Sequence, residues 1–150
     1  MHGERTWPGR RLLVAAAALW ALTGLAHGLG GLQELLNGPP REWATVAAQM
    51  RAVGFSMGPL RTDVYDVYRT FSWLFTVFLF ASAGSLLHAV RWTSEPCGRR
   101  RLALWHAAFA TAMNAVCLVF MTPPPVPFGL AIAVLCLESY RRQRAAALIS

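Results

Sequence analysis

The chain has 150 residues, of which 55% are hydrophobic and only 14% are charged, and its formal net charge is +7. This charged share lies well below the roughly 25% of soluble domains, so the composition indicates a membrane protein with one domain. The positive charge does not indicate nucleic-acid binding, because the arginines cluster at the ends of apolar runs instead of forming a stripe on a polar face.

Four apolar runs follow one another along the chain. They cover residues 12–32, about 68–90, 102–121 and 126–140. A bilayer core of about 30 Å needs roughly 20 helical residues, which the first three runs supply. The fourth run is shorter and spans only if its flanks reach the interface. We predict an all-α fold, an integral membrane four-helix bundle in a single transmembrane domain.

The arginines predict the direction of these spans. Arg10 and Arg11 precede the first run, four arginines and one glutamate lie in the loop 91–101, and three arginines lie in the tail 141–144. The positive-inside rule therefore places both termini in the cytoplasm. The loop 33–67 then lies outside, as does the proline-rich turn 122–127. All basic residues are arginine, which suits a GC-rich bacterial genome, so we expect the inner membrane of a bacterium.

An alternative interpretation treats residues 1–26 as a cleaved signal peptide. The segment has a basic beginning, an apolar middle and small residues before His27. Against this interpretation, the apolar run continues past His27 to Leu32. Glycines at helical spacing, Gly24, Gly28 and Gly31, also resemble helix-packing positions.

The outer loop 33–67 is predicted to be ordered. Within residues 41–55, apolar residues recur at helical spacing, at Trp43, Val46, Ala47, Met50 and either Val53 or Gly54. Such a helix could lie on the bilayer surface or cap the bundle. Thr62 and Asp63 then provide a helix start, so the second span is predicted to begin near Asp63.

Charged and aromatic residues crowd at that helix start, and two interpretations of them stay open. The group comprises Arg61, Asp63, Tyr65, Asp66 and Tyr68. Acids in a first helical turn match the helix dipole, and tyrosines are common at membrane interfaces, so the group needs no further role. The functional interpretation is that these side chains roof a polar pocket between the spans.

His27 is the second candidate. A helix rises 1.5 Å per residue, which places His27 in the outer half of the first span. The same arithmetic gives a similar depth for four polar residues of the second and third spans: Ser72, Thr76, Asn114 and Cys117. Polar side chains in a membrane tend to face the bundle interior. His27 lies between Gly24 and Gly28, so it can simply hydrogen-bond across a close helix contact. The alternative is a role in ligand binding or proton transfer.

No metal site or cofactor is expected. His88 and His106 lie near the inner ends of neighbouring spans, and two histidines suffice for haem ligation. They flank a short arginine-rich turn, however, where interfacial histidines are ordinary. The three cysteines lack the spacing of a zinc site or of a disulfide framework.

Four short motifs resemble those of an uncharacterised family of small bacterial four-span membrane proteins. They are TGLAH at 23–27, QMR at 49–51, MGPLRTDVYDVYRTFS at 57–72 and TPPPVPFGL at 122–130. The resemblance implies a compact membrane bundle with a loop packed on its outer side. It implies no activity, because none is associated with that group.

Two functions of different classes remain. The first is a non-catalytic membrane protein that acts through packing or through a membrane protein partner in the lipid bilayer. The second is a binding protein or enzyme for a lipid or other hydrophobic ligand, whose outer-side site would be built around three residues, His27, Asp63 and Asp66. The lining of that site would add Arg61, Tyr65, Tyr68 and Asn114.

Overall fold

The computed structural model describes residues 7–93, 95–119 and 126–149, and most of them are helical. The elements are α1 (Arg10–Asn37), the 3-10 helix η1 (Arg41–Trp43), α2 (Ala44–Ala52), β1 (Gly54–Met57), β2 (Leu60–Asp63), α3 (Val64–Trp92), α4 (Pro96–Val119) and α5 (Val126–Ile149). They form two compact units. The helical unit comprises Met1–Thr23 with Leu79–Ser150, and the hairpin unit comprises Gly24–Phe78.

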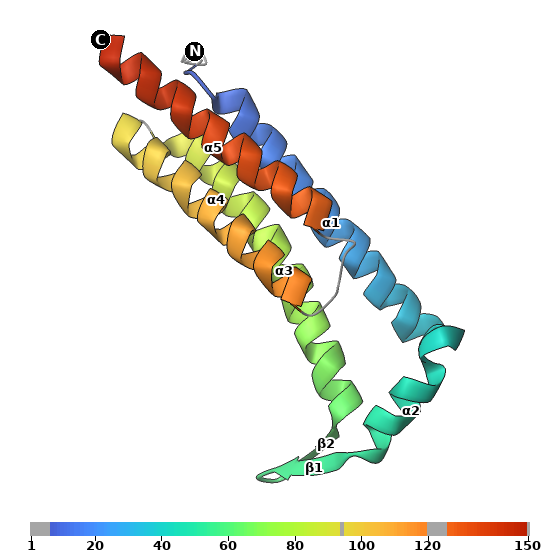
Figure 1. Ribbon diagram of the computed structural model, residues 1–150. Coiled ribbons are helices and arrows are strands. Elements are labelled where there is room, and N and C mark those ends of the chain that lie inside the picture. The colour runs from blue at the N-terminus through green and yellow to red at the C-terminus, as the bar shows by residue number, and fades with distance from the viewer. Residues whose placement is uncertain (1–6, 94, 120–125, 150) are drawn as a thin grey trace. The chain divides into compact units, whose positions relative to one another are not determined.

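In the helical unit, the first part of α1 and the last part of α3 accompany α4 and α5 (Figure 1). Trp20 of α1 lies against Phe109 of α4, with ring centroids 5.4 Å apart. The hydroxyl of Ser85 on α3 lies 3.4 Å from Nε2 of His106 on α4. These contacts join α1 and α3 to α4 in one packed unit.

The arginine-rich segments meet at one end of the helical unit. The start of α1, the end of α5 and the α3–α4 connection lie together there in Figure 1. The guanidinium of Arg99 lies 4.8 Å from the ring centroid of Trp7, and Ser139 donates a 3.0 Å hydrogen bond to the carbonyl of Gly9. The basic clusters at the start of α1, around the α3–α4 connection and in the second half of α5 therefore share one end.

Small residues fill the interior of the helical unit, whereas large apolar residues lie outside. The buried positions include Ala16, Ala17, Ala83, Ala103, Ala107, Ala110, Gly129, Ala133 and Ser139. The exposed positions include Leu87, Trp105, Val116, Leu118, Leu130 and Val134. Small side chains let helix backbones approach closely, and helices in a membrane associate in this way. Their large apolar side chains then face the lipid.

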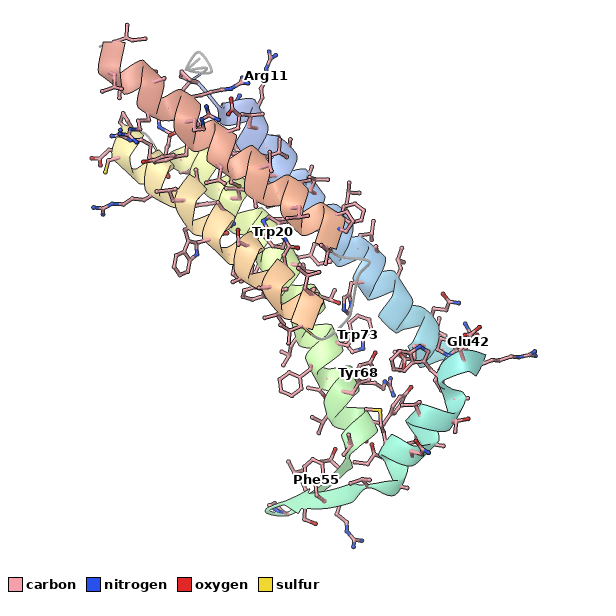
Figure 2. The ribbon with its side chains drawn as sticks, in the orientation of Figure 1. Arg11, Trp20, Glu42, Phe55, Tyr68 and Trp73 are labelled. Carbon is pink, nitrogen blue, oxygen red and sulfur yellow. The ribbon has the colours of Figure 1, made fainter. Side chains whose placement is uncertain are left out.

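In the hairpin unit, the second part of α1 packs antiparallel to the first part of α3. A Cβ at Gly28 would lie 3.1 Å from Cγ2 of Thr76, and a Cβ at Gly31 would lie 3.5 Å from the Trp73 ring. The predicted close helix contact around His27 is thus present. Figure 2 shows Trp73 on this stretch of α3, with Tyr68 nearer to the start of the helix.

The loop 33–67 is ordered, but part of it is not helical. The predicted helix over 41–55 is confirmed only for η1 and α2, which end at Ala52. The chain then forms an antiparallel hairpin in which Gly54 pairs with Asp63 and Met57 with Leu60. Gly58 has a φ of +63° in its two-residue turn, a conformation that glycine adopts without steric cost. The hairpin is a departure from the predicted all-α class.

Three helices are long and apolar enough to cross a membrane: α1, α3 and α4. They contain the first two predicted spans and residues 102–119 of the third, whose last two residues fall outside the described part of the chain. The predicted fourth span, 126–140, lies within α5, which continues to Ile149 and carries Glu138, Arg141 and Arg142 after its apolar part. Most of the predicted turn at 122–127 falls outside the described residues.

Candidate functional site

Asp63 closes the hairpin and caps α3. It is the last residue of β2, and its Oδ1 accepts a 2.8 Å hydrogen bond from the backbone N–H of Asp66. This is the bond that an N-cap side chain makes to the third residue of a helix, and it satisfies one of the free N–H groups of the first turn. The predicted helix start at Asp63 is confirmed, and the carboxylate has a structural role.

Tyr65 is the centre of the hairpin unit. Its side chain is only 3% exposed, and its hydroxyl donates a short hydrogen bond to the carboxylate of Glu34 on α1. The guanidinium of Arg51 lies 4.1 Å from the centroid of the Tyr65 ring, and that of Arg69 lies 5.8 Å from it. Both distances fall within the cation–π range, so one tyrosine joins α1, α2 and α3.

Two hollows lie within the hairpin unit, and Tyr65 lines the smaller of them. The larger has a volume of about 460 Å³, is open, and is lined by Arg51, Gly54, Phe55, Ser56, Arg61, Thr62, Asp63 and Asp66. The smaller, which we call the aromatic hollow, has a volume of about 110 Å³ and is lined by Glu34, Pro39, Pro40, Trp43, Ala47, Met50, Tyr65 and Tyr68. The predicted group at the start of α3 therefore divides between two hollows.

His27 lines neither of these hollows. Its Nδ1 lies 3.3 Å from the hydroxyl of Thr76, and its ring packs against Phe75 at 5.0 Å. Because the Thr76 hydroxyl also donates to the carbonyl of Ser72, the histidine is the expected donor, which favours the Nδ1-protonated tautomer. Asp66 lies ten residues before Thr76 on α3, about 15 Å along the helix axis. The structure thus separates His27 from Asp66 along the helix.

Asn114 belongs to the helical unit, where it is buried on α4 against Gly129 of α5. Its Nδ2 atom has no hydrogen-bond partner among the described residues. The carboxamide fills the space that a side chain at position 129 would occupy. Asn114 therefore has a packing role between α4 and α5.

The two histidines that could have held haem have different environments. His106 is buried beside Ser85, while His88 is exposed and stacks on Trp92, with centroids 6.2 Å apart. Within the described part of the chain, no group of three His, Cys, Asp or Glu side chains could hold a metal ion.

Sequence reasoning missed three residues around Tyr65: Glu34 and Trp43, which line the aromatic hollow, and Arg51, which lines the larger hollow. Glu34 could have been found, because it follows His27 by seven positions and Gly31 by three, and so shares their helix face. Trp43 was assigned to an apolar stripe, and Arg51 was placed off that stripe. Trp43 and Arg51 come close to Tyr65 only because of how the loop folds, and the spacing of residues in the sequence does not reveal that fold.

Comparisons of the chain with models of protein families, with curated proteins and with solved structures find no match.

Proposed function

We propose that this chain is a non-catalytic multi-pass protein of a bacterial inner membrane, with four spans, both termini in the cytoplasm and an ordered loop outside between the first two spans. On this proposal it belongs to the family of small four-span membrane proteins that its motifs resemble. It acts through helix packing and through contact with a membrane protein partner.

The distribution of side-chain size carries this proposal. Trp105 and Val119 are 71% and 73% exposed, while the alanines at 103 and 110 are fully buried. Water would penalise so much exposed apolar surface, at about 25 cal/mol per Å², whereas lipid does not. The exposed face of α5 is also apolar, at Leu130, Val134 and Leu137, which supports a fourth span.

The shared position of the arginines supports the direction. Three basic segments lie at one end of the helical unit. With four spans, all three segments can face the cytoplasm, as the positive-inside rule favours. The non-catalytic assignment is supported by the structural roles of the two best catalytic candidates. Asp63 caps α3, and His27 bonds across a helix contact.

Cysteine labelling tests the direction. Cys97 lies exposed near the start of α4, and Ser56 is exposed on the hairpin. A membrane-impermeant maleimide should label S56C in intact spheroplasts when Cys97 is replaced by serine. It should label Cys97 of the native chain only after lysis. Labelling of Cys97 in intact spheroplasts would contradict the proposed orientation.

A second candidate function is the binding of a lipid or other hydrophobic ligand on the outer side. The observation that favours it is the pair of hollows in the hairpin unit, which between them are lined by Arg61, Asp63, Tyr65, Asp66 and Tyr68. On this candidate, the purified protein retains lipid after exchange into detergent, and mass spectrometry of the preparation measures it.

A further inference from the structure

The aromatic hollow combines a carboxylate with three aromatic rings. Trp43 and Tyr68 are 55% and 42% exposed, so their faces are accessible, while Tyr65 forms a buried wall. Glu34 lies at the edge and is partly exposed. Aromatic faces attract cations through their quadrupole, and cages of such faces are a recurrent way of holding quaternary ammonium groups. A neighbouring carboxylate adds a full negative charge.

The charge of Glu34 is available to a ligand. One carboxylate oxygen accepts a hydrogen bond from the hydroxyl of Tyr65, which is a neutral donor. Within the described residues, no arginine lies within ion-pair distance of Glu34, whereas Glu138 of α5 is paired with both Arg141 and Arg142. Glu34 is therefore an acid held by a neutral donor beside an aromatic hollow.

Arg51 decides which kind of ammonium compound fits. Its guanidinium lies over the ring of Tyr65, which lines the aromatic hollow, while Arg51 itself lines the larger hollow. At this position it would repel a ligand that carried only positive charge. A ligand with a phosphate close to its ammonium group turns this repulsion into attraction, because arginine binds phosphate oxygens in a bidentate manner. The charges of Glu34 and Arg51 together match a zwitterion.

The residues of the aromatic hollow also lie next to the ends of two apolar runs, where a lipid headgroup would be. Glu34 comes shortly after Leu32, the end of the first apolar run, and Tyr68 lies at the start of the second. Residues that flank spans in this way lie in the headgroup region, where tyrosine and tryptophan are enriched. Exposed apolar residues beside it, such as Leu35 and Leu36, can meet acyl chains.

From these observations we infer that the aromatic hollow binds the zwitterionic headgroup of a membrane phospholipid. The ammonium group lies between Trp43 and Tyr68 beside Glu34, and the phosphate lies at Arg51. This inference rests on the second candidate function and specifies its ligand.

Competition among lipids tests the headgroup. The purified protein is delipidated and offered equal amounts of phosphatidylcholine, phosphatidylethanolamine and phosphatidylglycerol, and native mass spectrometry measures which lipids it retains. The first two should exceed the third by about tenfold, which corresponds to one extra charge-assisted contact. Glu34→Gln keeps an acceptor for Tyr65 but loses the charge, so this preference should disappear. Arg51→Gln should lower the retention of all three lipids.

Matched variants keep the result interpretable. Glu42→Gln removes an exposed acid of η1 that does not line the hollow, and Trp105→Ala removes an exposed tryptophan of α4. Both should retain the native preference, whereas Trp43→Ala should lose most of it. Retention of lipid without headgroup preference, or with a preference that E34Q leaves unchanged, overturns the inference but leaves lipid binding intact. Retention of no lipid overturns both.

Soluble competitors separate the two sources of this chemistry. Phosphocholine carries the same charged groups without acyl chains, so it should displace the phospholipid only at concentrations more than about a hundredfold higher, because buried acyl CH₂ groups contribute about 0.8 kcal/mol each. Displacement at equal concentrations would mean that the hollow binds a soluble compound, and it would overturn the assignment to a lipid.

Discussion

At the scale of single residues, several polar side chains of this protein pack or form hydrogen bonds between helices. Asn114 is the clearest case. The sequence places it in the outer half of a span, which predicts an inward-facing polar group. The sequence does not reveal that its carboxamide fills the space above Gly129, because that contact depends on the register between α4 and α5.

Replacing Gly129 by alanine should therefore destabilise the protein. The added Cβ would lie 2.8 Å from Cγ of Asn114, closer than side chains pack, and overpacking of this kind costs about 1–3 kcal/mol of unfolding free energy. Thermal unfolding in detergent measures the loss. In an Asn114→Ala background the same substitution should cost much less, as a double-mutant cycle would show.

Gly84→Ala is the matched control for this substitution. Gly84 also lies within a helix, but nothing lies within 4 Å of an added Cβ. The gain in helix propensity should raise the unfolding free energy by up to about 1 kcal/mol. Equal losses for G84A and G129A would show that the packing against Asn114 is not the cause.

At the scale of elements, the sequence predicted long helices better than the loop between them. Apolar runs of about 20 residues and a capping residue locate the first three spans and the start of α3. The strands of the hairpin contain only four residues each, and Arg61 and Thr62 interrupt any apolar alternation there. Helical spacing over 41–55 therefore dominated the prediction, although the chain leaves the helix after Ala52.

The two interpretations of Asp63 predict different results for two substitutions. Asp63→Ala removes the side-chain acceptor at the start of α3 and should lower the unfolding free energy by about 1 kcal/mol. Asp63→Asn keeps an acceptor and should change it by only a few tenths. Hydrogen exchange of the amides of Tyr65 and Asp66 would locate the effect.

The same pair tests a charge-dependent role. If the carboxylate of Asp63 served a ligand instead of the helix, D63N would reduce lipid retention as strongly as D63A while leaving stability unchanged. If Asp63 is a structural cap, D63A should lower stability more than D63N does, and D63N should leave lipid retention unchanged. Lipid retention and thermal unfolding are measured on the same preparations.

At the scale of the whole molecule, the number of spans depends on α5. Its apolar part, from Val126 to Leu137, is shorter than the other runs, because charged residues begin at Glu138. Its exposed positions nonetheless include Leu130, Val134 and Leu137, and its buried positions include Gly129 and Ile132. An even number of spans is what brings both termini to the same side.

A charge on the outward face of α5 tests this number. Val134 is 63% exposed within the apolar part, and Leu148 is 81% exposed beyond the arginines. In a bilayer, arginine at a central position costs about 2.5–3.5 kcal/mol of insertion free energy, whereas near a helix end it can reach the interface. A green fluorescent protein fused to the C-terminus should therefore fluoresce in the native chain and in L148R. In V134R the signal should fall, because a fraction of the molecules leaves α5 outside. Equal fluorescence of V134R and L148R would mean that α5 does not cross the membrane.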